Sequence, residues 1–366
     1  MKKFLLPVIF ILSALTARAQ QFDYNVGVQY GFINSEYSSS KNLFEESGTF
    51  NRANLTAEAG MRFDQKAGLT HTVRGGLVFG KELGLSIEDQ LDKQFLAYYR
   101  IDKKTLWGNL SAAMGIFPRN FSEGKYHEAI FSKEHCFTDT AFEGMMIKYR
   151  EKGFYGELGL DWFGKYGTGS RERFQILSAG KWTMFGDFSL GWDACIYHFA
   201  CSEELSNVVD NMFAHPYVLY EPATSLQKFS VSAGWMQKYD WDRACPDEKK
   251  FNGGLTANLK IGHWNVGLDN ELFFGQDLMP NFIESNDGVF YKTDLYFGNR
   301  FYHTQIEGFS LYNRAEIFYE PSIGDWIKLR ISAIFHIGNP TGEFGFFRGW
   351  QQLLTVAVDL DSLRRK

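Results

Sequence analysis

The feature that most constrains this chain is an alternation of apolar and polar side chains, repeated in long segments from end to end. The stretch IKLRISAIFHIG (residues 327–338) shows the pattern, because Leu329 and Ile331 alternate with Lys328 and Arg330. Successive side chains of an extended strand point to opposite faces. One face of this strand is therefore apolar and the other carries two neighbouring cations, so the two faces must contact different surroundings.

The same alternation recurs in sixteen segments, most of which contain 9 to 13 residues. Strands of ordinary globular proteins cluster at about five or six residues, whereas a tilted strand that crosses a membrane needs about nine to eleven. The lengths therefore favour membrane-crossing strands. The expected strands are residues 22–31, 51–63, 68–80, 94–101, 105–117, 144–150, 154–163, 171–182, 187–199, 215–221, 228–239, 253–261, 265–275, 309–320, 327–337 and 350–360.

The connections between these segments alternate in length. Those after even-numbered segments are tight, and those after odd-numbered segments are generally longer and polar, the largest being residues 33–48, 118–142, 200–214 and 276–308. Short turns at one end and long loops at the other are typical of a bacterial membrane barrel with an even strand number.

One segment leaves the strand count open. Residues 289–299 also alternate, but counting them as a strand would put the short turn at 321–326 on the wrong side. We therefore assign them to the seventh long loop and expect sixteen strands, with fourteen and eighteen as alternatives.

The N-terminus has the layout of a secretory signal peptide. Lys2 and Lys3 precede the apolar run 4–14, and Ala17 and Ala19 supply the small residues of a cleavage site. We expect a signal peptide over residues 1–19 and a single domain over residues 20–366. No other apolar run is long enough for a transmembrane helix, and a barrel also produces a negative mean hydropathy such as the −0.27 found here.

The tryptophans are sorted toward the ends of the expected strands. Amphipathic rings of this kind form girdles at the two interfaces of a membrane with water. Trp107, Trp182, Trp264 and Trp326 lie beside short turns, whereas Trp162, Trp235, Trp241 and Trp350 lie toward the long loops and Trp192 lies near mid-strand.

With this alternation, loop asymmetry and girdle pattern, the chain resembles the outer-membrane porins of Gram-negative bacteria. The resemblance is architectural and covers the whole of residues 20–366. It implies an all-β, closed antiparallel transmembrane β-barrel of about sixteen strands, with short periplasmic turns and long extracellular loops. It also implies a location in the outer-membrane lipid bilayer, insertion by the outer-membrane assembly machinery, and assembly that is often a homotrimer.

Two features depart from the porin pattern. The last strand, LLTVAVDL, runs into the charged tail DSLRRK instead of ending on an aromatic residue. The third long loop, residues 118–142, has the ordinal position of the loop that narrows the pore in porins but lacks the acidic motif of that loop. No individual residue role is therefore carried over from the family.

The polar faces of the strands predict the lining of a lumen. Thirteen cations and seven anions fall on these faces, which predicts a channel for passive diffusion of small hydrophilic solutes with a weak preference for anions. The expected cations are Arg62, Arg74, Arg100, Lys148, Arg150, Arg171, Arg173, Lys181, Lys238, Lys260, Arg314, Lys328 and Arg330, and the expected anions are Glu58, Glu157, Asp161, Asp193, Asp269, Glu271 and Glu316.

The four cysteines lack any C-x-x-C spacing, and an oxidising compartment would allow a disulfide between Cys201 and Cys245, with Cys195 as a competitor for Cys201. We expect no cofactor, no metal site and no nucleic-acid partner, because the corresponding motifs are absent from the sequence. The alternatives to a channel are a barrel enzyme or surface receptor that uses the long loops, and a soluble periplasmic β-protein.

Overall fold

The computed structural model describes residues 20–38, 47–84, 91–204, 207–243, 249–282, 292–304, 306–340 and 345–360. The expected signal peptide, residues 1–19, lies outside the described residues.

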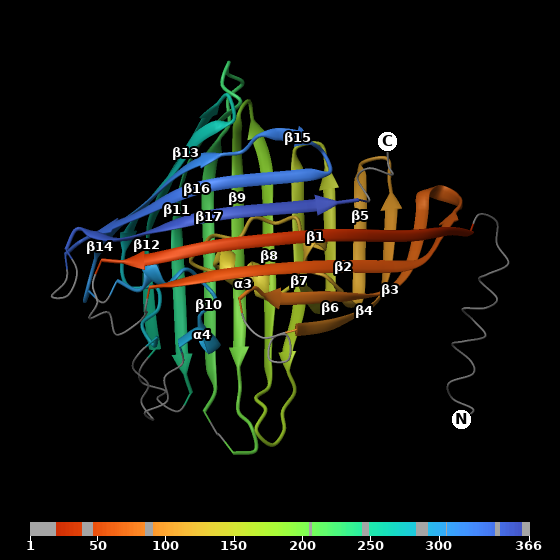
Figure 1. The fold of residues 1–366 in the computed structure, drawn as a ribbon, viewed down its shortest axis with the longest axis horizontal. Helices are drawn as coiled ribbons and strands as arrows, with labels where there is room; N and C mark the ends of the chain where they lie inside the picture. The colour runs from red at the N-terminus through yellow and green to blue at the C-terminus, as the bar shows by residue number, and fades with distance from the viewer. Residues whose placement is uncertain are drawn as a thin grey trace.

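One antiparallel sheet closes on itself (Figure 1). Each strand pairs with its neighbour in sequence, and the first strand, β1 (Gln20–Tyr37), pairs with both β2 (Gly48–Gln65) and the last strand, β17 (Phe347–Asp359). The three-residue β15 (Ser322–Gly324) sits in the turn before β16, and β14 pairs directly with β16, so sixteen strands form the wall. The prediction of a closed sixteen-stranded barrel is confirmed.

The remaining strands of the wall match the sequence segments to within a few residues at most ends. They are β3 (Leu69–Glu82), β4 (Leu91–Lys104), β5 (Gly108–Pro118), β6 (Ala141–Glu151), β7 (Phe154–Gly164), β8 (Arg173–Phe185), β9 (Phe188–Phe199), β10 (Val209–Tyr220), β11 (Lys228–Asp242), β12 (Lys249–His263), β13 (Val266–Gly275), β14 (Ser310–Tyr319) and β16 (Ile327–Gly338).

The helices in the described part of the chain are short and lie in the connections. They are α3 (Lys133–Thr138), α4 (Lys292–Leu295) and the 3-10 turns η1 (Lys66–Gly68), η2 (Arg119–Phe121) and η3 (Arg300–Tyr302). None of the helices among the described residues is long and apolar enough to cross a membrane.

Burial follows the alternation read from the sequence. On β16, Ile331 and Ile337 are 47% and 37% exposed, whereas Ser332 and His336 are buried. The apolar face of the stretch IKLRISAIFHIG therefore forms part of the outer surface, and its polar face points into the barrel. Trp107 and Trp264, beside short turns, are each 80% exposed and extend the apolar outer surface to that end.

The connections have the predicted asymmetry. Two residues join β12 to β13, whereas residues 119–140 join β5 to β6 and residues 276–309 join β13 to β14. The described part of the stretch 289–299, residues 292–299, contains α4 and no strand, so its assignment to the seventh long loop holds there.

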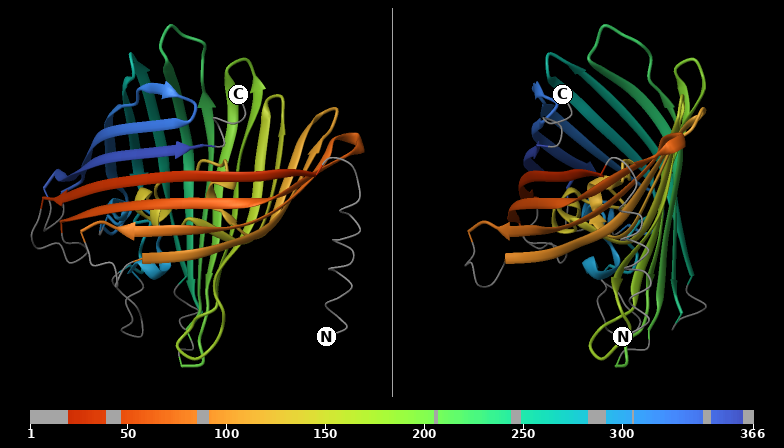
Figure 2. Two further views of the ribbon diagram at one scale, coloured as in Figure 1. Left: turned by 45° about the vertical axis from the view of Figure 1, so that its right-hand side comes forward. Right: turned by 90° about the vertical axis from the view of Figure 1, so that its right-hand side faces the viewer.

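The described parts of the two longest connections fold into the barrel and build a core there. We call residues 119–140 the first inward loop and the described residues 276–282 and 292–304 the second. Figures 1 and 2 show α3 between the red and orange strands β1–β4 and the green strands β8–β10. Phe121 packs against Phe117 of the wall with ring centroids 5.5 Å apart, and Tyr302 packs against Tyr312 at 4.8 Å. The lumen is therefore largely filled by side chains from the two loops.

Adjacent residues of β2 provide a test of which face contacts lipid. Leu55 is 43% exposed on the outer surface, and Thr56 points inward, two residues before Glu58. We expect Leu55→Arg to weaken folding into lipid vesicles by about 2–4 kcal/mol, the cost of a mid-bilayer cation on a barrel, whereas Thr56→Arg should cost far less. Urea titration of vesicle-inserted protein measures both, and equal losses would contradict the assignment of the two faces.

Candidate functional site

The first inward loop carries a short helix that lies in the lumen. Ser132 caps α3, because its hydroxyl oxygen accepts the backbone N–H of His135 at 3.1 Å. At the other end of the helix, the backbone N–H of Asp139 donates to the carbonyl of His135 at 2.8 Å. These bonds satisfy backbone groups that a helix end leaves without partners, so the helix holds its shape in the middle of the barrel.

Arg119 fixes the base of this loop. Its guanidinium donates to Asp139, at the point where the loop returns to the wall, and to Asp161 of β7 at 2.5 Å. Asp161 also accepts the backbone N–H of Glu143 at 2.8 Å. Because both ends of the loop converge on this largely buried ion pair, the base of the loop is fixed to the wall at β7.

Glu157 of β7 holds the first half of the loop. It accepts hydrogen bonds from the Ser122 hydroxyl at 2.5 Å, the backbone N–H of Glu123 at 2.9 Å and the Tyr126 hydroxyl at 2.9 Å. Tyr155 of the same strand donates to it as well. Burial, together with the charge of Glu157, raises the pKa of Tyr126.

A second ion network ties the loop to the opposite wall. Glu128 lies 3.0 Å from Arg314 of β14, and Lys133 lies 3.2 Å from Glu316 of the same strand. Glu316 also pairs with Arg330 of β16 at 2.8 Å. Burial alone would raise the pKa of Glu128, but Arg314 and Lys133 outweigh it and lower the pKa to about 2.

The second inward loop is anchored on β10 and β11. The Tyr296 hydroxyl donates to Asp240 at 2.7 Å, and the Asn211 side-chain amide donates to the carbonyl of Leu295 at 2.9 Å. Lys238, fully buried, pairs with Asp240 and Asn211. The two loops also touch each other, since the backbone N–H of Asn299 donates to the carbonyl of Glu128 at 2.7 Å.

Thr256, His215 and Asp193 form a hydrogen-bonded row inside the barrel. The His215 ring joins Thr256 at 2.8 Å through Nε2 and Asp193 at 2.9 Å through Nδ1. Their order matches a nucleophile, a base and an orienting acid. All three are buried, and none lines the three cavities described below, so the row joins β9, β10 and β12 as a contact inside the wall.

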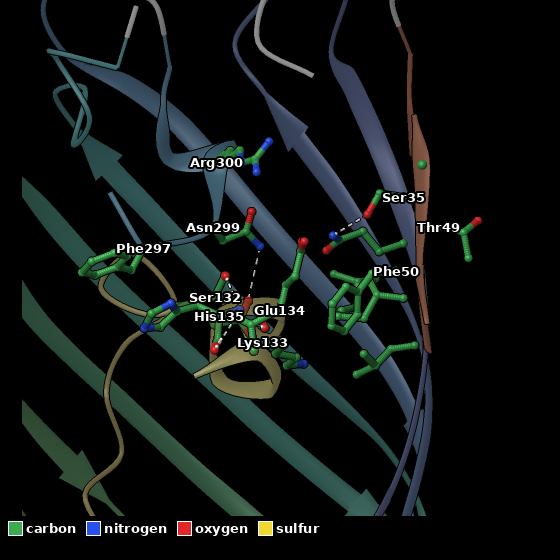
Figure 3. Close-up of a pocket in the computed structure, with 18 of the residues that line it drawn as sticks. Ser35, Thr49, Phe50, Ser132, Lys133, Glu134, His135, Phe297, Asn299 and Arg300 are labelled. Carbon is green, nitrogen blue, oxygen red and sulfur yellow. Dashed lines mark hydrogen bonds and ion pairs between the residues drawn. The ribbon is translucent and has the colours of Figure 1, made fainter. Parts of the chain in front are cut away.

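Two cavities lie between α3 and the wall formed by β1, β2 and β17, and we call them together the passage. The outer cavity has a volume of about 510 Å³ and is lined by Ser35, Thr49, Gln351 and other residues of the wall and by the loop residues Lys133 and Arg300. Figure 3 shows Ser132 and residues 133–135 of α3 facing Ser35 and Phe50 across this space. A second cavity of about 250 Å³ lies deeper, lined among others by Gln29 and Thr56, and His135 lines both cavities.

Phe137 of α3 narrows the passage. Its ring lies against Gly31 of β1, where an added Cβ would come within 2.8 Å of the ring carbons. Its carbonyl accepts a hydrogen bond from the side-chain amide of Asn54 on β2 at 2.8 Å. Glycine at position 31 therefore lets the helix approach the wall, and the ring of Phe137 sets the width at this level.

The residues expected to line the lumen lie mostly on inward faces of the strands, and most of the cations are paired with carboxylates. One placement differs from the expectation. β8 begins at Arg173, so Arg171 lies in the loop before it, where it donates to the carbonyls of Ala200 and Asn207 at 2.9 and 3.0 Å. Arg173 itself begins the inward row of β8.

The pairs are as follows: Arg62 with Asp64, Arg74 with Asp23 and Glu58, Arg100 with Asp102, Lys148 and Arg150 with Glu123, Lys181 with Glu221, Lys238 with Asp240, Lys260 with Asp269, Arg314 and Arg330 with Glu316. Of the other expected anions, Glu271 lies 3.0 Å from His127. Lys328 is exposed at the turn end of the barrel, beside a third cavity of about 370 Å³.

The cysteine prediction is open. Cys245 lies outside the described residues, and Cys136, Cys195 and Cys201 are free thiols. Cys195 faces the interior, where its thiol lies 3.8 Å from the side-chain oxygen of Gln175. Among the described residues, no group of three or more His, Cys, Asp or Glu side chains is placed to hold a metal ion.

Sequence reasoning missed the loop residues that shape the passage. Arg119, Glu128, Lys133 and Phe137 look like ordinary loop residues because their partners are distant in sequence. One signal was available: the stretch DLYFGNRFY (residues 294–302) is strongly aromatic for a loop that would face water. Aromatic residues in a long polar loop indicate a segment that is buried when folded.

Comparison with known proteins gives a likeness of fold. No family model and no curated protein sequence matches the chain. The outer membrane protein OmpT of Vibrio cholerae, folded in vitro and in its trimer form, has a TM-score of 0.53 and 10% identity over 93% of this chain and 99% of its own. OprD of Pseudomonas aeruginosa has a TM-score of 0.47 and 11% identity over 93% of this chain and 96% of its own.

The closed barrel, its apolar outer surface and its inward loops define the class of protein, an outer-membrane β-barrel. Within that class the chain has the porin-like architecture that the sequence pattern resembled.

Glu128 provides a test of the loop anchors. A carboxylate whose pKa is lower in the folded than in the unfolded protein stabilises the fold above its unfolded pKa of about 4.5, and this stabilisation is lost as the pH falls toward 2. We expect Glu128→Gln to cost on the order of 2–3 kcal/mol at neutral pH and to flatten the pH dependence between pH 5 and pH 2. Urea midpoints measured across this range provide the readout.

Glu134 is the matched control on the same loop. Burial and the nearby charge of Glu82 raise the pKa of Glu134, so its charged form is disfavoured in the folded protein. Glu134→Gln should therefore not lower stability at neutral pH. Equal losses of stability from Glu128→Gln and Glu134→Gln would show that the ion pairs of Glu128 with Arg314 and Lys133 are not what stabilises the fold.

Proposed function

We propose that this protein is a porin-like outer-membrane channel through which small hydrophilic solutes diffuse passively. The observation that carries the proposal is the passage between α3 and the wall of β1, β2 and β17. Its lining combines hydroxyl, amide and charged groups, including the wall residues Gln29 and Thr56. Polar groups of this kind can replace the water that surrounds a hydrophilic solute.

The size of the passage limits the solutes. The outer cavity of about 510 Å³ lies within the roughly 300–1,000 Å³ range of small-molecule sites. Below it, Phe137 leaves less room against Gly31. We infer that single sugars, amino acids and ions pass, and that longer oligomers are excluded.

The charge preference is weaker than the strand residues alone indicate. The excess of thirteen cations over seven anions predicted a weak anion preference, but Arg314 and Arg330 share Glu316 and other cations are paired similarly. The loops add Glu128 and Glu134 to the lining of the outer cavity. The anion preference stays a prediction, and we expect it to be small.

The expected surroundings follow from the same proposal. The apolar outer surface is suited to a lipid bilayer, and a closed barrel of this type requires the outer-membrane assembly machinery. The homotrimer implied by the resemblance to porins stays a prediction.

Conductance across planar bilayers tests the passage directly. Phe137→Ala should raise the single-channel conductance because it removes the ring that narrows the passage, and Thr56→Trp should lower it by more than half because an indole would enter the deeper cavity. Ala57→Trp, which places the same indole on the outer face of β2, is the control and should leave conductance unchanged. The absence of any channel in the unmodified protein would end the proposal.

Reversal potentials in a salt gradient test the charge preference. Chloride should be slightly more permeant than potassium, and the difference should shrink at high salt because ions screen the field. Lys328→Glu should shift the ratio toward cations, whereas Lys103→Glu, on the outward face of β4 at its turn end, should not. Clear cation selectivity in the unmodified protein would contradict the prediction.

A further inference from the structure

Two amide side chains interrupt the apolar outer surface. Asn270 of β13 and Asn313 of β14 both lie on the outward face, because the next residue of each strand, Glu271 and Arg314, faces inward and bonds to the interior. The two asparagines are partly exposed. They are therefore outward polar groups in the part of the surface that faces lipid.

Asn270 lies at the middle of its row and not at a membrane edge. On the same face of β13, Val266 is 51% exposed on one side, and Leu272 and Phe274 are 38% and 46% exposed on the other. On β14, Ile317 below the pair is 52% exposed and Leu311 above it is 39% exposed. Apolar residues thus flank the amide pair in both directions along the barrel axis.

The pair satisfies only part of its hydrogen-bonding capacity. The Asn313 amide nitrogen donates to the side-chain oxygen of Asn270 at 3.1 Å and to the carbonyl of Glu271 at 2.9 Å. Within the part of the chain that the structure describes, the amide nitrogen of Asn270 and the side-chain oxygen of Asn313 have no partner. Hydrocarbon cannot supply one, so leaving these groups against lipid is costly.

Ser178 of β8 shows the contrasting case on another part of the outer surface. It also lies on the outward face, but its hydroxyl donates to the carbonyl of Glu157 at 3.0 Å and accepts the indole N–H of Trp192 at 3.0 Å. Its hydrogen bonds are complete within the barrel. Ser178 therefore finds its hydrogen-bond partners within its own barrel, whereas the asparagine pair does not.

The direct neighbours of the amide pair on the outer face are mostly apolar. Asn270 lies between Leu259 of β12 and Ala315 of β14, and Asn313 lies between Leu272 of β13 and Ile337 of β16. Polar side chains embedded in a membrane can bond across a contact between two surfaces. The partly unsatisfied amides are therefore the property of this patch that favours association within a bilayer.

We propose that the outer face of β13 and β14 binds a second copy of this chain around a twofold axis; this inference rests on the proposed membrane location. On each copy the amide N–H of Asn270 and the side-chain oxygen of Asn313 lack partners among the described residues. In a second, identical patch the Asn313 oxygen can accept from that N–H, and the Asn270 N–H can donate to that oxygen. A twofold axis brings a patch against itself. In a ring of three copies the patch would meet a different surface, which need not carry both groups, so this inference departs from the homotrimer that the resemblance to porins implies.

Native mass spectrometry of the full-length chain in mild detergent, over a range of protein concentrations, tests the pair. Unmodified protein should form dimers, and the double variant Asn270→Leu, Asn313→Leu should raise the dissociation constant by roughly tenfold for each amide replaced. Ser178→Ala, the matched change of a locally satisfied polar group, should leave the constant unchanged. Heat-modifiable migration on gels and channel conductance of the same samples show whether the barrel has folded and inserted, so failure of the dimer is distinguishable from failure of the channel.

A cross-link locates the contact. Leu272 lies opposite Asn313 in the register, so cysteines introduced by Leu272→Cys should meet near the axis and give an oxidised dimer in vesicles. Leu190→Cys, on the exposed face of β9, should give no more oxidised dimer than the unmodified protein gives. A monomeric unmodified protein, an oligomer that the double leucine variant leaves intact, or equal cross-linking at both positions would overturn the proposal.

Discussion

The rest of the structure depends on one constraint, that backbone N–H and C=O groups facing hydrocarbon must be paired with each other. A sheet meets it only by closing, as the pairing of β1 with both β2 and β17 does here. Closure in turn assigns every second side chain to lipid and every other one to the lumen. Leu55 and Thr56 are adjacent in sequence, yet Leu55 faces lipid and Thr56 faces the lumen. The alternation of apolar and polar residues is therefore a consequence of this hydrogen-bonding requirement.

The interior follows a different rule, since it is packed as a protein core. Charges inside it are compensated: Glu316 contacts Lys133, Arg314 and Arg330, and Lys238 is buried against Asp240. Removing one partner of a buried pair costs about 3–5 kcal/mol, because the other charge is left without compensation. The ion pairs therefore fix where the inward loops stand, and the passage is the space that they leave along the wall of β1, β2 and β17.

The sequence predicted the wall far better than the interior. Strand period and turn length are local properties, so β7, β9 and β16 begin within a residue of the expected positions. The start of β8 was misjudged, because Arg171 continues the alternation but bonds to the neighbouring loop through Ala200 and Asn207. The passage was not predictable by such reasoning. Glu128 and Arg314 are 186 positions apart and meet only after the barrel has closed, and Phe137 matters because Gly31 happens to face it.

The anchoring of the first inward loop has a consequence for the order of assembly. Arg119 can meet Asp161 as soon as β7 is in place, but Glu128 and Lys133 need Arg314 and Glu316 of β14. A chain that adds strands in sequence would therefore carry a loop secured at its base and free at its tip until the last quarter of the wall arrives. The width of the passage would therefore be fixed only late in assembly, when the strands that close the barrel are added.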